Sequence, residues 1–437
     1  MKFSAHLGKG AWGFATKLLP AIYGAVMTIL VFKVLPKTES GELALFILIF
    51  GNIFTFADSF ALQAIVKFGV DTTNDLQELL TATSILFFAF LSVILSIFIV
   101  IPGTLASLLQ STELPALVPS LIILVVVTIP RVIASKIFQM RFHTKYLFFV
   151  DLVNFGGASI IITIFSFMGK LHTASDVIAV TIIAGLTSSL LALFLARADL
   201  KGKFRISKPM LKKIFHFTRY QTATGTVHVL QQNLDTYLVP VFFGMEALAN
   251  YQVAKFFFRG FDILRDTQGI FVFPATSKYY ANGDIATLKK IIEKATSFLF
   301  LLMFPLCILL IVFAPLLFQI LYKGKFDDSI GIFRVLIASG FVLPVSMVGV
   351  ATLVGMGKVK ELFQTIIASL IVNVILAAIF LPLVGTIGAA IAFCISMLLQ
   401  AILCYRIMKR EVPLSLREML FRGIEDGRNF LKEKRGK

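Results

Sequence analysis

The stretch ALANYQVAKFFFRGFDILRDTQGIFVF, residues 247–273, has the length and phenylalanine content of a membrane-spanning helix, yet it carries several ionisable side chains. An uncompensated Arg, Lys or Asp at the centre of a bilayer costs roughly 2.5 to 3.5 kcal/mol. These side chains therefore cannot face lipid, and they must face water or one another. They are Lys255, Arg259, Asp262, Arg265 and Asp266.

The charged residues of this stretch fall on one side of a helix. At 100° per residue, four of them lie within about 60° of one another, and Arg265 lies about 60° further round. We therefore expect a membrane helix with one water-facing side. The alternative is that the charges pair and bury against another helix, because Arg259, Asp262 and Asp266 are spaced i,i+3 and i,i+4. We favour water, since so many charges from one helix need many partners in a dry interface.

The chain as a whole is strongly hydrophobic. Of its 437 residues, 58% are hydrophobic and 15% are charged, and the mean hydropathy is +0.90. This composition excludes a soluble domain and indicates a polytopic membrane protein. The apolar runs are too long for the strands of a membrane barrel, so the expected fold class is all-α. About twelve transmembrane helices are expected, at residues 11–32, 43–66, 79–101, 115–137, 147–168, 176–196, 218–243, 247–273, 296–321, 330–356, 362–384 and 386–408.

Basic residues are distributed unevenly between the two sides of the membrane. If both termini are cytoplasmic, the outside loops carry only Lys33, Lys37, Lys170, Lys323 and Lys325 of the 41 Lys and Arg residues. The positive-inside rule then predicts a multi-pass protein of the cell membrane with both termini in the cytoplasm. Most of the net charge of +17 lies in residues 197–213 and 409–437. We interpret these segments as anchors beside anionic membrane lipids rather than as a nucleic-acid surface.

A basic linker at residues 197–217 divides the expected spans six and six. An even number of spans gives the two halves the same orientation, which is the parallel-repeat arrangement with a site between the halves near the membrane midplane. We predict an N-terminal six-helix bundle at residues 1–205, a C-terminal six-helix bundle at 206–410 and a basic cytoplasmic tail at 411–437.

Polar residues also occur in other expected spans. His228 and Asp235 belong to a polar arc in the span 218–243, which is typical of a helix that lines a cavity, although interhelical hydrogen bonds are the alternative. Lys17 and Arg219 lie near cytoplasmic helix ends, where a long basic side chain can also reach the membrane surface. Asp58 lies beside a polar stripe in the second span.

The basic residues of the central helix favour an anionic ligand. Counter-charge in a low-dielectric cleft is worth more than in water, and Arg binds two phosphate oxygens through parallel hydrogen bonds. The candidate substrate-binding residues are Lys17, Arg219, Lys255, Arg259 and Arg265. The candidate ion-coupling residues are His228, Asp235, Asp262, Asp266 and Asp58.

Several short motifs carry a resemblance to a known family. In the second half these are NLDTYL at 233–238, FG at 243–244, NYQVA at 250–254, FPA at 273–275 and NGD at 282–284; in the first half they are LP at 35–36, SG at 40–41, AD at 57–58 and QAIVKF at 63–68. The pattern resembles the polysaccharide flippases, which export O-antigen and lipid-linked oligosaccharides. These belong to the multidrug/oligosaccharidyl-lipid/polysaccharide exporter superfamily, together with the multidrug and toxin extruders.

The resemblance implies two six-helix bundles in a MATE-like V shape, alternating access and a polyprenyl-diphosphate-linked glycan as cargo. It also places Asp235 at the acidic residue of the family's seventh-helix motif. We expect a monomer that works without a cofactor or bound metal and switches between states by binding protons or sodium. Membrane lipids and polysaccharide assembly proteins are the other expected partners.

Two other functions stay open. A multidrug or toxin cation antiporter of the same fold predicts an acid-dominated cavity, whereas the central helix has more basic than acidic residues. A membrane-embedded glycosyltransferase or polymerase needs an outside loop that holds a sugar donor and a metal, and the loop containing Asp327 and Asp328 is too short for this. A Gly-rich phosphate loop ending in Lys-Ser or Lys-Thr does not occur in the sequence, which argues against direct ATP drive. The expected protein is a transporter rather than an enzyme.

Overall fold

The computed structural model describes residues 3–69, 76–201 and 205–422, and within these ranges all regular secondary structure is helical. For residues 3–11, 13–14, 220–221, 224 and 228 the structure describes the backbone and not the side chains. The helices form two compact units, which we describe separately. The first unit contains Met1–Val229 and Phe243–Ala249, and the second contains Leu230–Phe242 and Asn250–Lys437.

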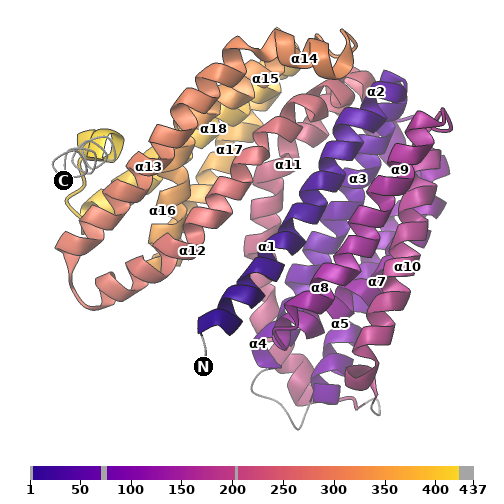
Figure 1. Ribbon diagram of the computed structural model, residues 1–437, viewed down its shortest axis with the longest axis horizontal. Helices are drawn as coiled ribbons and strands as arrows, with labels where there is room; N and C mark the ends of the chain where they lie inside the picture. Colours follow the sequence, from indigo (N-terminus) through magenta and orange to yellow (C-terminus); the bar gives the residue numbers. More distant parts are fainter. Residues whose placement is uncertain (1–2, 70–75, 202–204, 423–437) are drawn as a thin grey trace. The chain divides into compact units, whose positions relative to one another are not determined.

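The first unit is built from long helices, several of which contain short π-helical turns (Figure 1). Its helical segments are α1 (Phe3–Ala25), η1 (Val26–Val31), α2 (Phe32–Val34), α3 (Lys37–Ala57), η2 (Asp58–Leu62), α4 (Gln63–Phe68), α5 (Leu76–Val100), α6 (Pro102–Leu108), α7 (Leu114–Met140), α8 (Thr144–Asp151), η3 (Leu152–Gly156), α9 (Gly157–Phe167) and α10 (Ala174–Leu200).

Helices α7 and α10 pack closely because α10 presents small residues to its neighbours. Ala184, Ser188 and Ser189 are buried, and Ser189 donates a 2.5 Å hydrogen bond to the carbonyl oxygen of Val127 in α7. Ser188 contacts the side-chain oxygen of Asn154 at 3.2 Å. Membrane helices associate through close approach of this kind, since lipid supplies no hydrophobic force between them.

Two glutamates at the start of α3 hold the N-terminal ends of neighbouring helices. Glu42, which is 4% exposed, accepts hydrogen bonds from the Ser111 hydroxyl and from the backbone amides of Thr112 and Glu113, just before α7 begins. Glu39 accepts a 2.6 Å hydrogen bond from the amide of Ala174, the first residue of α10. Because the first amides of a helix have no partners within it and carry partial positive charge, carboxylates are favourable there.

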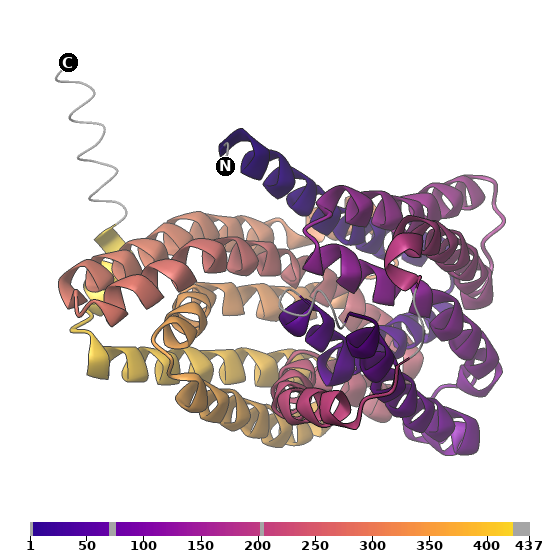
Figure 2. The same ribbon diagram turned by 90° about the horizontal axis from the view of Figure 1, so that it is seen from below.

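The second unit contains α12 (Gly260–Ala281), α13 (Ile285–Val312), α14 (Ala314–Tyr322), α15 (Ser329–Ala338), η4 (Ser339–Phe341), α16 (Leu343–Gly355), α17 (Val359–Val384) and α18 (Thr386–Glu411). Figures 1 and 2 show the long helices of this unit, coloured from salmon to yellow, lying lengthwise beside one another. Helices α17 and α18 form a tight hairpin, in which Gly388 of α18 lies against the backbone of Phe380.

The residues that follow α18 pack back onto α13. Glu293 of α13 is fully buried, accepts a 3.2 Å hydrogen bond from the amide of Ser415 and pairs with Arg422. Leu414 and Met419 are also buried. The described part of the C-terminal segment is therefore a packed part of this unit.

Helix α11 (Lys208–Phe258) contributes to both units. Its early residues Met210 and Ile214 form a core with Ala64, Leu79 and Ala82 of the first unit. Residues 206–229, which we assigned from the sequence to the C-terminal bundle, therefore pack within the first unit in this structure.

Nine helices in the described ranges are long and apolar enough to cross a membrane. A tenth span results if Ser329–Phe341 and Leu343–Gly355, which are bent by 52°, count as one. The two remaining expected spans, 218–243 and 247–273, fall in α11 and α12, which are helical but more polar. The prediction of an all-α multi-pass membrane protein is confirmed.

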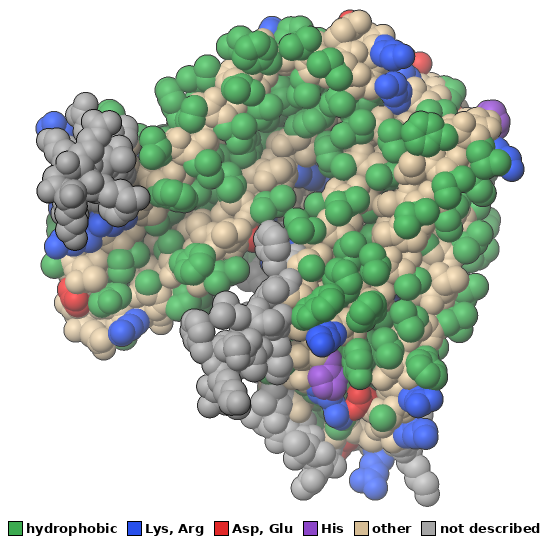
Figure 3. Space-filling view, viewed as in Figure 1, with side chains coloured by type: hydrophobic (Ala, Val, Ile, Leu, Met, Phe, Trp, Pro, Cys, Tyr) green, Lys and Arg blue, Asp and Glu red, His purple; other side chains and the backbone are tan. Residues whose placement is uncertain are grey.

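Hydrophobic side chains cover most of the visible face of α8, α9 and α10, whereas Lys and Arg side chains gather near the lower ends of these helices (Figure 3). Ile160, Phe167, Leu190 and Phe194 are each more than half exposed. Apolar exposure on this scale is expected where lipid replaces water as the solvent.

We expect Glu42→Ala to destabilise the protein, because the substitution leaves the buried Ser111 hydroxyl and the amides of Thr112 and Glu113 without their acceptor. The expected loss is roughly 1 to 3 kcal/mol, measured as a lower unfolding temperature in detergent. Glu246→Ala, which removes an exposed glutamate from the same unit, is the control. Equal unfolding temperatures for the two variants would contradict the anchoring role of Glu42.

Candidate functional site

The candidate site depends on a sharp break in α11. Gly244 has φ 74° and ψ −171°, a conformation that glycine adopts without steric cost. In a straight helix, twenty residues span about 30 Å, yet the Lys255 Nζ atom lies 2.6 Å from Asp235 Oδ1. The chain therefore reverses near Gly244, and the segments 230–242 and 250–258 lie side by side within the second unit.

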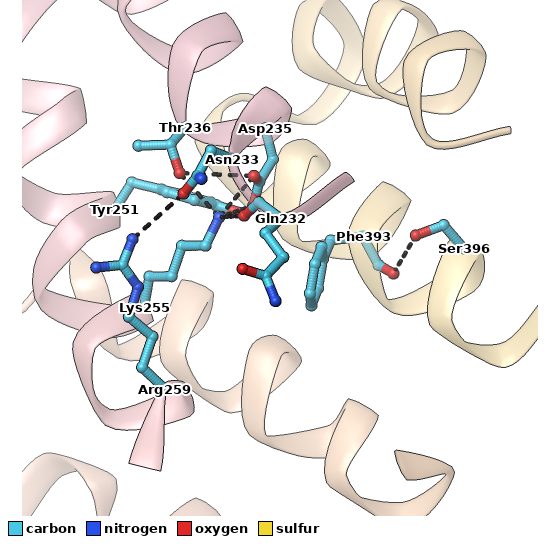
Figure 4. A network of polar contacts seen from close by, with 9 residues as sticks. All are labelled: Gln232, Asn233, Asp235, Thr236, Tyr251, Lys255, Arg259, Phe393 and Ser396. Atoms are coloured by element: carbon cyan, nitrogen blue, oxygen red, sulfur yellow. Dashed lines mark hydrogen bonds and ion pairs between the residues drawn. The ribbon is translucent and has the colours of Figure 1, made fainter. Parts of the chain in front are cut away.

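The Lys255 ammonium is enclosed by oxygen atoms (Figure 4). It lies 2.6 and 2.8 Å from the two carboxylate oxygens of Asp235, 2.6 Å from the carbonyl oxygen of Gln232 and 2.8 Å from the hydroxyl oxygen of Thr236. The Tyr251 hydroxyl donates a 2.5 Å hydrogen bond to Asp235 Oδ2. Every donor and acceptor at the centre of this network therefore has a partner.

The ion pair is almost completely shielded from solvent. The side chains of Lys255 and Asp235 are 3% and 0% exposed. The rings of Tyr251 and Phe393 lie 5.7 and 5.5 Å from the ammonium, within the range of cation–π attraction. Our expectation that all the charges of this segment face water is therefore wrong for Lys255, because its partner lies across the helix break and was not visible from spacing along one helix.

Arg259 lies at the junction of α11 and α12 and behaves differently. Its side chain belongs to an exposed residue, and the guanidinium donates a 3.4 Å hydrogen bond to the side-chain oxygen of Asn233. The ion pairs of Asp235, Asp262 and Asp266 in this region are made with Lys255 and Arg265. The guanidinium is therefore held in place from one side.

The remaining charges of the stretch pair on the surface of α12. Arg265 Nη1 lies 2.8 Å from Asp262 Oδ1, and its Nε lies 3.6 Å from Asp266 Oδ1. All three side chains are between about one third and one half exposed. Both alternatives considered for the stretch thus occur: Lys255 is paired and dry, whereas Arg259 and the Arg265 group reach solvent.

The other candidate residues belong to the first unit. Asp58 opens the π-helical segment η2 and pairs with Lys136 at 2.6 Å, and it accepts a 2.5 Å hydrogen bond from Gln63. Lys17 in α1 and Arg219 in α11 are exposed. The side chain of His228 lies outside the described residues.

Tyr251 and Thr236, which belong to the Asp235 network, and Lys136, which pairs with Asp58, were not predicted from the sequence. One signal was available. Asp235 and Lys255 are each ten residues from Met245, beside the Phe243-Gly244 pair, and a helical hairpin centred there brings the two charges together. The position of Lys136 had no comparable signal, because it comes from a distant helix.

In the described part of the chain, no group of three or more His, Cys, Asp or Glu side chains is arranged to hold a metal ion. The three cysteines are unpaired, and Cys307 and Cys404 are buried.

Solved structures with the same fold define the class of protein. A multidrug resistance transporter of the MATE family matches with a TM-score of 0.76 at 15% identity, over 91% of this chain and 98% of that one. The lipid II flippase MurJ matches with a TM-score of 0.74 at 15% identity, over 96% and 90% of the two chains. The protein is thus a multi-pass membrane protein with the fold of MATE-type transporters.

The family is established by sequence. Residues 30–331, more than half of the chain, match the model of a family described as polysaccharide biosynthesis proteins, and the chain belongs to this family. A Shigella flexneri protein named "Putative O-antigen transporter" is 24% identical over 233 residues, which cover 53% of this chain and 55% of that protein. An uncharacterised membrane protein of Methanocaldococcus jannaschii is 23% identical over 192 residues, covering 44% and 38%. The chain thus spans about half of the first relative's length and less of the second's.

We expect single substitutions at the buried ion pair to be strongly destabilising. Lys255→Met leaves the Asp235 carboxylate buried without its counter-charge, and Asp235→Asn does the same to the Lys255 ammonium. Either change should cost about 3 to 5 kcal/mol, measured as a lower unfolding temperature in detergent. The double variant should regain much of the loss because it removes both charges. A double variant as unstable as the sum of the single ones would contradict the pairing.

Proposed function

We propose that the protein translocates an anionic polyprenyl-diphosphate-linked oligosaccharide across the cell membrane by alternating access. Membership of the polysaccharide biosynthesis family, the similarity to an O-antigen transporter and the fold shared with MurJ support this proposal. In this proposal both termini lie in the cytoplasm, and the glycan and diphosphate pass through the protein while the polyprenyl chain stays in lipid.

The observation that carries the proposal is the exposed guanidinium of Arg259. It lies next to a buried pair whose charges cancel, and it is separate from the ion pairs of Arg265, so its positive charge is available to an anion. A guanidinium binds phosphate oxygens through two parallel hydrogen bonds. Arg265 adds a second cationic group when a phosphate competes with Asp262 and Asp266 for it. Lys17 and Arg219 are further exposed basic residues in this proposal.

A change of access needs an ion or ligand that binds the two states differently. Asp262 and Asp266 are partly exposed and can exchange protons or sodium with solvent, and Asp58 is a third such carboxylate in the first unit. We therefore assign ion coupling to these residues in preference to the buried Asp235.

The sharpest test of the proposal is removal of the Arg259 charge. Arg259→Gln should reduce the surface display of the glycan by on the order of tenfold to a hundredfold, because a hydrogen bond to a charged group is worth about 1.5 to 3 kcal/mol. The measurement is a glycan blot of cells that lack the native gene and carry the variant. Arg259→Lys should retain part of the activity.

The matched control is Lys278→Gln, which removes an exposed charge from the same helix, α12, and should leave display unchanged. Full display with Arg259→Gln at normal protein level would contradict a role in diphosphate binding. Normal glycan display together with drug sensitivity in a deletion strain would instead favour a multidrug transporter of the same fold.

A further inference from the structure

The surroundings of Lys255 are those of a bound cation. Four oxygen atoms from Gln232, Asp235 and Thr236 approach its Nζ atom at 2.6 to 2.8 Å, although an ammonium has only three hydrogens to donate. A carboxylate, a backbone carbonyl and a hydroxyl are also the oxygen ligands that hard metal cations prefer. We refer to these oxygens as the Asp235 cage.

The geometry of the chain lets Lys255 fill the Asp235 cage from within the fold. The cage residues lie in the segment 230–242, and Lys255 reaches them from the other side of the turn at Gly244. The ammonium and carboxylate are almost fully shielded, and Tyr251 donates to the same carboxylate. An additional cation would be repelled by the ammonium, and both oxygens of the buried carboxylate already accept hydrogen bonds.

We propose that Lys255 is the tethered counter-cation of Asp235, so that the native Asp235 cage takes no sodium or other free monovalent cation. Removing the Lys255 side chain to its Cβ turns the same oxygens into a site for a small monovalent cation. The residual negative charge of Asp235, buried away from water, then supplies the attraction. In this arrangement the carboxylate is a permanent part of the second unit and is not emptied and refilled during a transport cycle.

The inference concerns cation occupancy of the folded protein and does not depend on which substrate is carried. Its consequence for the proposed function is that any sodium dependence of transport arises at carboxylates other than Asp235. The test of cation occupancy uses the purified full chain in detergent without any glycan. Its result is therefore independent of the glycan-display experiment that tests the proposed function.

The experiment measures the unfolding temperature at constant ionic strength. Sodium chloride is substituted stepwise for the chloride salt of N-methyl-D-glucamine, a large organic cation. Ligands that bind only the folded state raise its stability in a saturable way. Because sodium should not bind at Asp235 in the native protein, the unfolding temperatures of native protein and Asp235→Asn should respond to sodium in the same way.

Lys255→Ala should have a lower unfolding temperature in the organic cation, and this temperature should rise by several degrees as sodium increases. Lys255→Ala/Asp235→Asn should lose that response.

A saturable stabilisation of the native protein by sodium that disappears in Asp235→Asn would overturn the proposal, because the cage would then take a free cation beside Lys255. A folded Lys255→Ala variant that responds to neither sodium nor potassium would overturn it as well. If Lys255→Ala does not fold in the organic cation, purification of Lys255→Ala and Lys255→Gln in sodium provides the second readout. Recovery of folded Lys255→Ala in sodium alone supports the proposal, and failure of both variants in sodium opposes it.

Discussion

The buried ion pair between Lys255 and Asp235 is the interaction on which the rest of the second unit's polar chemistry depends. It joins two helical segments that are separated in sequence by a sharp turn at Gly244, and it does so where neither charge reaches solvent. A charge in such a place must be neutralised within the protein, because the bilayer offers no other partner. The pair therefore fixes the register of the two segments and leaves no net charge behind.

This neutralisation determines which residues remain for binding. Lys255 is paired with Asp235, and Arg265 forms ion pairs with both Asp262 and Asp266 on an exposed surface. Arg259 takes part in none of these ion pairs and is exposed. The chain thus combines a sealed pair, which contributes to the fold, with an accessible guanidinium, which we propose supplies anion affinity. Both lie within one turn or so of the break between α11 and α12.

Much of the fold follows from the sequence, because long apolar runs allow few structures in a bilayer. Ten of the twelve expected spans coincide with the apolar helices, and the other two are the polar segments 218–243 and 247–273. The site was less predictable for a physical reason. Helical periodicity places Lys255 beside Arg259, but it contains no information about a partner on the other side of a turn. The sequence therefore predicted an accessible Lys255, whereas its ammonium is paired with Asp235 in the structure. The pairing of Asp58 with Lys136 was hidden in the same way, since those residues come from different helices.

The most direct test of the central claim is equilibrium binding of a short-chain prenyl diphosphate to the purified protein, compared with the uncharged prenyl alcohol of the same length. A site built around an accessible guanidinium predicts saturable binding of the diphosphate, weakening as salt increases, and much weaker binding of the alcohol. Equal affinity for the two ligands, or diphosphate binding that is insensitive to salt, would contradict the account.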